Sequence, residues 1–170
     1  MAARLSLREY QRELVERLRT AETAQATSKL GLQLGEESWL VDLWDAGEVI
    51  PVPSITPLPL MQPWFKGLAS VRGNLYSVVD FPAFVGLPPV TPGDQARLLL
   101  LNERFRTGAA LLVERSLGLR NATQFKPRAA GKGDAPAWLK GQYSDADGRL
   151  WKELDIARLA KDAGFLEVGA

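Results

Sequence analysis

The sequence contains no cysteine and no histidine, and these two absences remove several classes of function. Without cysteine, the chain has no disulfide framework, no thiolate metal site and no thiol nucleophile. Without histidine, it lacks the usual general base and the commonest ligand of transition metals. Catalysis would have to rest on Asp, Glu, Lys or Tyr. These absences weigh against an enzyme without excluding one, and we expect no cofactor and no metal.

Net charge and long apolar runs are also scarce. The net charge of +1 provides no overall field that would attract nucleic acid or an anionic membrane. No apolar run approaches the roughly 18 residues that a membrane-spanning helix needs, and the N-terminus lacks the apolar stretch of a secretory signal. These features predict a cytoplasmic protein. Its 170 residues, 46% of them hydrophobic, suit one folded domain or two small ones.

The first 28 residues predict an N-terminal helix. Ser6 and Glu9 have the spacing of a capping box, in which each side chain satisfies a free backbone N–H. Apolar residues then recur at helical spacing up to Leu18, which predicts a helix from Leu7 to about Thr23. The apolar stripe consists of Leu7, Tyr10, Leu14, Val15 and Leu18. Such a stripe favours packing on the protein's own domain, with the groove of a partner protein as the alternative.

From Leu30 onwards, the pattern is mainly that of β-structure. Residues 30–34 and 39–43 alternate apolar and polar side chains, which predicts a hairpin. Residues 50–63 contain five prolines and predict an extended connector. Further strands are predicted at 65–73, 75–80, 97–103, 107–114, 117–119 and 148–154. A mobile loop is predicted at 126–136, and a helix at 156–163.

One short pattern occurs twice, 75 residues apart. A Lys-Gly pair is followed by Gly73 and Asp80 in the first copy, and by Gly148 and Asp155 in the second. Both aspartates suit the N-cap of a short helix. The glycines, Gly67 included, suit turns or a close approach of two backbone segments. A unit as long as this offset can form about five short strands.

The repetition predicts a mainly β protein made of two tandem five-stranded SH3-like β-barrels. We expect the N-terminal helix in residues 1–28, the first barrel in 29–94 and the second in 95–170. The second barrel would end in a short C-terminal helix, and strands are free to cross between the barrels.

The stretch "FKGLASVRGNLYSVVDFPAFVGL" (residues 65–87) resembles the signature of CheW-like coupling domains. Its most specific part is Val71-Arg72-Gly73. The resemblance extends over about Leu30 to Val168, through the opening hairpin (30–50), the hairpin at 97–119, and the closing strand and helix. With its added N-terminal helix and its ending at 164–168, the chain is most similar to the variant that serves type IV pilus (twitching motility) chemosensory systems.

The resemblance implies a non-catalytic cytoplasmic adaptor. Its partners would be the regulatory domain of a CheA-type histidine kinase and the cytoplasmic tip of chemoreceptors, in arrays at the inner membrane. Outside such arrays we expect a monomer. The implied partner-binding residues are Glu48, Val49, Ile50, Val71, Arg72 and Gly73.

Each of these assignments has a structural alternative. The Arg72 guanidinium, at a turn between strands, can pair with a partner's carboxylate, but it can also be solvated or form an internal salt bridge between the barrels. Glu48, placed by the resemblance in a short turn, can be an idle surface carboxylate. Val49 and Ile50 can line a groove for receptor helices or simply pack in the core.

Two other functions remain open at this stage. The chain can be a regulatory module of a larger signalling kinase, or a nucleic-acid-binding domain of the OB or SH3-like kind. Basic residues are more frequent in the middle of the chain, but no regularly spaced aromatic residues, on which bases could stack, alternate with them. They are Arg97, Arg104, Arg106, Arg115, Arg120, Lys126 and Arg128.

Overall fold

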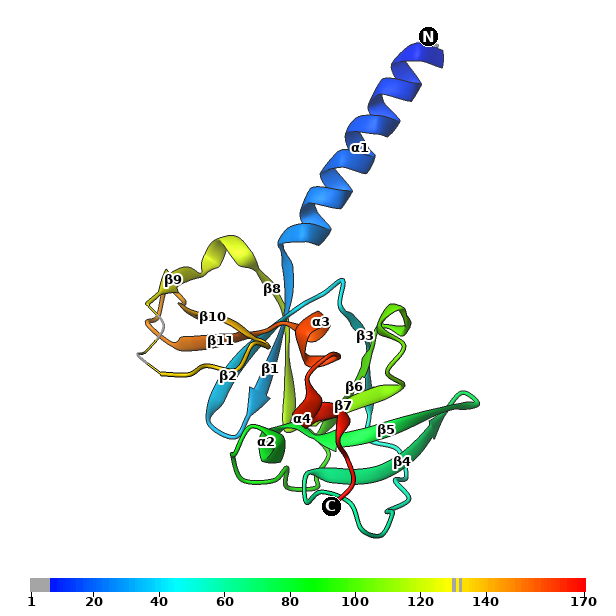
Figure 1. Ribbon diagram of the computed structural model, residues 1–170. Coiled ribbons are helices and arrows are strands. Elements are labelled where there is room, and N and C mark those ends of the chain that lie inside the picture. Colours follow the sequence, from blue (N-terminus) through cyan, green and yellow to red (C-terminus); the bar gives the residue numbers. More distant parts are fainter. Residues whose placement is uncertain (1–6, 130, 132) are drawn as a thin grey trace.

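The structure is a computed structural model that describes residues 7–129, 131 and 133–170. The predicted capping residue Ser6 lies outside this range. The described chain begins with a long helix, α1 (Leu7–Thr27), and continues into eleven strands and several short helices (Figure 1).

Two sheets form the body of the protein. The first has six strands in the order β8-β1-β2-β11-β10-β9, and the second has five in the order β3-β6-β7-β5-β4. The strands of the first are β1 (Ser28–Leu34), β2 (Glu37–Asp42), β8 (Arg115–Asn121), β9 (Lys126–Arg128), β10 (Leu139–Ser144) and β11 (Leu150–Leu154). Those of the second are β3 (Ala46–Pro51), β4 (Phe65–Val71), β5 (Asn74–Asp80), β6 (Arg97–Leu101) and β7 (Ala109–Val113). The short helices are α2 (Phe81–Phe84), α3 (Ile156–Leu159), α4 (Ala163–Leu166) and the 3₁₀ turns Glu103–Phe105 and Ala122–Gln124.

The two halves of the chain repeat the same path, and each half leaves its first two strands in one sheet and continues in the other. β1 and β2 pair with each other, whereas β3 crosses to the other sheet and pairs with β6. In the second half β6 and β7 pair with each other, whereas β8 crosses back and pairs with β1. Each half then adds a hairpin, β4–β5 or β10–β11, whose second strand runs parallel to β7 or β2. Each sheet therefore contains strands from both halves of the chain.

A backbone bridge connects the two edges of the five-stranded sheet. Thr56 follows β3 and forms two hydrogen bonds with Leu68 of β4, at 2.8 and 2.9 Å. β3 and β4 are the edge strands of this sheet. The bridge therefore brings the sheet towards a closed barrel, which protects the edges from pairing with other chains.

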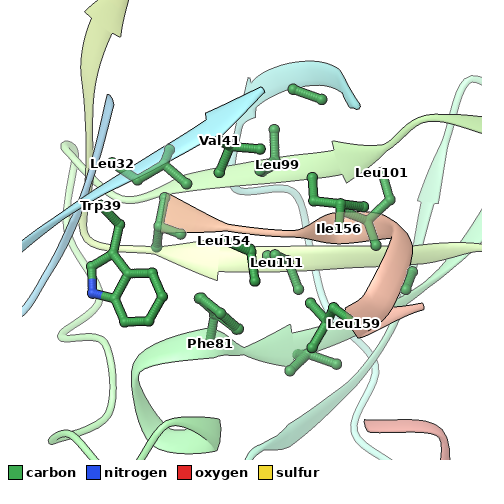
Figure 2. Close-up of a cluster of buried hydrophobic side chains, with 14 of the residues drawn as sticks. Leu32, Trp39, Val41, Phe81, Leu99, Leu101, Leu111, Leu154, Ile156 and Leu159 are labelled. Carbon is green, nitrogen blue, oxygen red and sulfur yellow. The ribbon is translucent and has the colours of Figure 1, made fainter. Parts of the chain in front are cut away.

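One apolar core joins both sheets. It contains side chains of the six-stranded sheet such as Leu32, of the five-stranded sheet such as Leu111, and of the short helices α2 and α3 (Figure 2). The rings of Trp39 and Phe81 meet edge to face, with centroids 5.7 Å apart. A smaller cluster around Leu98 belongs to the five-stranded sheet. Because close-packed interiors deform little, the two sheets form one stiff body.

The expectation that α1 packs on its own domain is wrong. Its apolar side chains are exposed, from 46% for Leu14 to 75% for Leu7, and the helix projects away from the body (Figure 1). Thr27 is followed directly by Ser28 of β1, so no linker allows the helix to fold back. No helix in the described part of the chain is both long and apolar enough to cross a membrane.

Three local predictions also need correction. Glu48 lies inside strand β3 and not in a turn. The predicted loop at 126–136 begins with strand β9, which pairs with β10. The predicted helix at 156–163 already ends at Leu159, and a second helix, α4, starts at Ala163, where the Asp162 carboxylate accepts the Phe165 N–H at 3.0 Å.

Candidate functional site

The candidate site begins at the turn between β4 and β5. Val71 and Asn74 are paired, which leaves Arg72 and Gly73 as a two-residue loop. Their φ angles are 51° and 84°, and two successive positive values are typical of a type I′ turn. Glycine adopts this conformation easily, whereas arginine does so at an energetic cost. The turn points the Arg72 side chain outward, and it is 69% exposed.

Glu48 of β3 binds the Arg72 guanidinium with both carboxylate oxygens. Nη1 donates to Oε2 at 2.7 Å, and Nη2 donates to Oε1. The hydrogen bond from Arg72 lowers the pKa of the Glu48 carboxyl, and the bond to Glu48 raises the pKa of Arg72. The pair spans the sheet from the β4–β5 turn to the opposite edge strand. Arg72 thus forms an internal salt bridge, but within the five-stranded sheet and not between two barrels, and its partner is the other charged residue that the resemblance implies.

This ion pair lies at a small groove of about 310 Å³. Leu100 and Leu101 of β6 line the groove together with polar and charged side chains. The full lining is Gly47, Glu48, Val71, Arg72, Asn74, Tyr76, Leu100, Leu101, Asn102 and Glu103. The groove suits a polar or charged side chain of a partner, because either member of the exposed pair can exchange its bond for an intermolecular one.

The other implied partner-binding residues contribute less surface. Val49 and Ile50 are half-buried and pack against different apolar clusters, Val49 against the shared core and Ile50 against the smaller one. Val71 is also half-buried against the smaller cluster, whereas Gly73 is exposed. The structure therefore gathers Glu48, Val71 and Arg72 around one groove, with Gly73 in the adjoining turn, but does not present Val49 and Ile50 as an open apolar surface.

The residues selected as caps and turns have well-defined local roles. The Asp80 carboxylate is fully buried and accepts the N–H groups of Ala83 and Val90 at 3.1 and 3.0 Å. Asp155 caps α3 by accepting the Arg158 N–H at 3.0 Å. Gly148 has a positive φ of 78° in the β10–β11 turn, and Gly73 has the matching place in the β4–β5 turn with a φ of 84°. None of these groups faces the groove.

A second surface was not found from the sequence. An apolar groove of about 540 Å³ lies beside the proline-rich connector. Its lining is Val52, Pro53, Ile55, Pro57, Lys66, Val90, Pro92, Gly93, Ala96 and Leu112. The sequence does contain a pattern that could have indicated this groove. Val52 and Ile55 lie three residues apart among prolines, and in a polyproline-type extended chain this spacing places both side chains on one side. The proline count alone predicts an extended connector and not a binding surface.

The other charged residues do not gather into a further site within the described residues. The basic residues of the nucleic-acid alternative lie on β6, β8 and β9 and at the 3₁₀ turn after β6, and Arg104 is engaged by Asp45. Among the described residues, no group of three or more carboxylates is arranged to hold a metal ion.

Comparisons with known proteins give a consistent picture. The family profile described as "CheW-like domain" matches residues 29–164. "Protein PilI" from Pseudomonas aeruginosa is 31% identical over 153 residues, which cover 86% of this chain and 83% of that protein. The fold is similar to the crystal structure of "scaffolding protein TtCheW" from Thermoanaerobacter tengcongensis, with a TM-score of 0.63 and 19% identity. That match covers 76% of this chain and 88% of the other.

Proposed function

The chain belongs to the CheW-like domain family, and from this premise we propose that it is an adaptor that couples chemoreceptors to a CheA-type histidine kinase. It acts without catalysis and without a cofactor, in the cytoplasm, within receptor arrays at the inner membrane. Outside these arrays it is a monomer. The similarity to PilI over most of the chain supports a place in a chemosensory system for type IV pili and twitching motility.

The observation that carries this proposal is the meeting of Arg72 and Glu48 at an exposed groove. Both residues were selected as partner-binding from the resemblance, and they lie 24 positions apart in the sequence. An exposed, bidentate pair is a suitable contact for a signalling partner, because its bonds can be exchanged without unpacking the core.

The stiffness of the body supports the same function. An adaptor must hold two partners in a fixed relation, so that a change in one alters the balance of states in the other. The core shared by both sheets meets that requirement. The apolar groove beside the proline-rich connector offers a second surface on the same body. Transient interfaces of modest size depend on a few residues, so single substitutions are informative.

The proposal is tested by measuring binding of the purified chain to a kinase regulatory domain and, separately, to a receptor tip. We expect Arg72→Ala and Glu48→Lys each to weaken binding of at least one partner about tenfold or more. Arg115→Ala is the matched control. It removes another exposed arginine, one that binds Gln33 on the six-stranded sheet, and should leave both affinities unchanged.

A charge-swapped variant separates partner contact from internal pairing. Arg72→Glu combined with Glu48→Arg keeps an ion pair within the sheet but exchanges the positions of the positive and the negative charge that a partner would contact. Loss of binding in the swapped variant supports direct contact, whereas full recovery would show that the pair acts only within the sheet. Wild-type protein that binds neither partner would refute the adaptor function itself.

A further inference from the structure

We propose that α1 is a self-association element that pairs, parallel and in register, with α1 of a second copy of this chain. The adaptor function above does not require this pairing, and the observations that carry it are different ones. They are the free apolar stripe of α1, the order of the residues along it, and the charges at its edges.

The stripe of α1 has no cover within the described chain. The apolar side chains from Leu7 to Leu18 are about half exposed or more. Described residues from Leu7 to Ala24 are all exposed, so no part of the body packs on this length of the helix. At about 100° per residue, Leu7, Leu14, Leu18 and Ala21 fall on one face of the helix. An exposed face of this kind in a soluble protein marks an interaction site.

The order of residues along the stripe is typical of a coiled-coil dimer. Leu7, Leu14 and Ala21 are spaced by seven residues, and Gln11 and Leu18, also seven apart, lie between them. These are the d and a positions of a heptad repeat, with leucine at two of the three d positions. A polar residue at one a position, here Gln11, favours a fixed register at some loss of stability.

The edges of the stripe determine the orientation. In a parallel pair, each g residue lies near the e residue five positions later on the other helix. Arg17 then meets Glu22 of the second copy, and Tyr10 meets Val15 of the second copy, each contact occurring twice. In an antiparallel pair centred on Leu14 and Leu18, Arg8 would also meet Glu22 of the second copy twice, but Arg17 would face Arg17 of the second copy, a repulsion that the parallel pair avoids. Charge complementarity therefore favours the parallel arrangement.

The charge balance of α1 also argues against a membrane as the occupant of the stripe. The helix contains four arginines and four glutamates, whereas helices that lie on anionic lipid are rich in Lys and Arg. The pairing is weak, because a stable interface uses about 20 to 30 residues a side and this one uses far fewer. The chain is therefore a monomer when dilute and pairs where its local concentration is high, as in an array.

The absence of native cysteine allows a direct test. A Gln11→Cys variant of the full chain places one thiol at an a position, and Glu16→Cys places one on the opposite face. Under mild oxidation at high protein concentration, we expect Gln11→Cys to form a disulfide-linked dimer at least about tenfold faster than Glu16→Cys. Equal rates would overturn the proposal. In a mixture of Gln11→Cys and Ala21→Cys, a preferred mixed disulfide would show antiparallel pairing and would also overturn it.

Sedimentation equilibrium of the cysteine-free chain provides a second test. We expect the average mass of the wild type to rise with concentration, and Leu14→Glu to shift this rise to at least about tenfold higher concentration. Thr23→Glu adds the same charge on the outer face and should behave like the wild type. Circular dichroism checks that each variant keeps its fold. A wild type that stays monomeric up to millimolar concentration, or that pairs through α1 only with a receptor tip or kinase domain, would refute pairing between copies.

Discussion

Glu153→Gln is expected to reduce the free energy of unfolding by about 3 kcal/mol, because it leaves a buried lysine without its main counter-charge. Glu153 of β11 is only 2% exposed and Lys29 of β1 is 8% exposed. Lys29 Nζ lies 2.8 Å from Glu153 Oε1, and Lys140 Nζ lies 3.2 Å from the same oxygen. Asp42 is a weaker partner of Lys29 at 3.4 Å. Because this second carboxylate remains, we expect the loss to stay near the lower end for a broken buried pair.

Urea unfolding at neutral pH measures this loss, and two variants serve as controls. Glu48→Gln breaks an ion pair at the surface, where Glu48 and Arg72 are exposed, so we expect only a small change there. Lys29→Met combined with Glu153→Leu removes both buried charges and should recover most of the lost stability. Equal effects of Glu153→Gln and Glu48→Gln would contradict the assignment of the buried pair.

The same pair predicts how stability depends on pH. Burial alone would raise the pKa of the Glu153 carboxyl, but hydrogen bonds from Lys29 and Tyr143 and the nearby lysine charges lower it below its usual value. Its contribution is therefore present above the unfolded-state pKa of about 4.3 and is lost as the pH falls through the folded pKa. Burial lowers the pKa of Lys29, but Glu153 and Asp42 outweigh this and raise it. Its contribution is present below about 10.4 and is lost as the pH rises further.

The sequence located those features that depend on neighbouring residues. The hairpins, the turn at Arg72-Gly73 and the caps at Asp80 and Asp155 each follow from a short pattern of apolar spacing, glycine and aspartate. The family resemblance, which rested on residues close together in the chain, was confirmed by the match over 29–164. Local chemistry was thus sufficient for most strands.

The features that the sequence did not reveal depend on contacts between distant residues. The pairing of β3 with β6 and of β8 with β1 cannot be read from a local sequence pattern. Apolar alternation predicts a strand but does not say which sheet the strand joins. The Lys29–Glu153 pair joins residues 124 positions apart. The helix α1 stands away from the body because Thr27 leads directly into β1. The sequence did not reveal this, because an apolar stripe has the same pattern whether it packs on its own domain or on a partner. The pairing of Arg72 with Glu48 could likewise be seen only once the positions of β3 and of the β4–β5 turn in the sheet were known.

Gly67→Ala is expected to destabilise the protein by about 3 kcal/mol or more, because no side chain fits where Gly67 approaches the connector. A Cβ at this position would lie 2.0 Å from the Thr56 carbonyl oxygen. The φ of Gly67 is 132°, a region that other residues rarely adopt. The clash cannot be relieved by a rotamer, since the obstacle is backbone, and Thr56 must move away from Leu68. Strain and overpacking of this kind each cost about 1–3 kcal/mol.

Gly148→Ala is the matched control, since Gly148 has a φ of 78° but no atom within 4 Å of a built Cβ. It carries the conformational cost without the clash, so we expect a loss of about 1 kcal/mol. Urea unfolding gives both values. Hydrogen exchange of the Thr56 and Leu68 amides reports the bridge itself, and exchange should accelerate in Gly67→Ala alone. Equal stability of the two variants, with unchanged exchange at Thr56, would mean that the contact between connector and β4 does not hold the edges of the five-stranded sheet together.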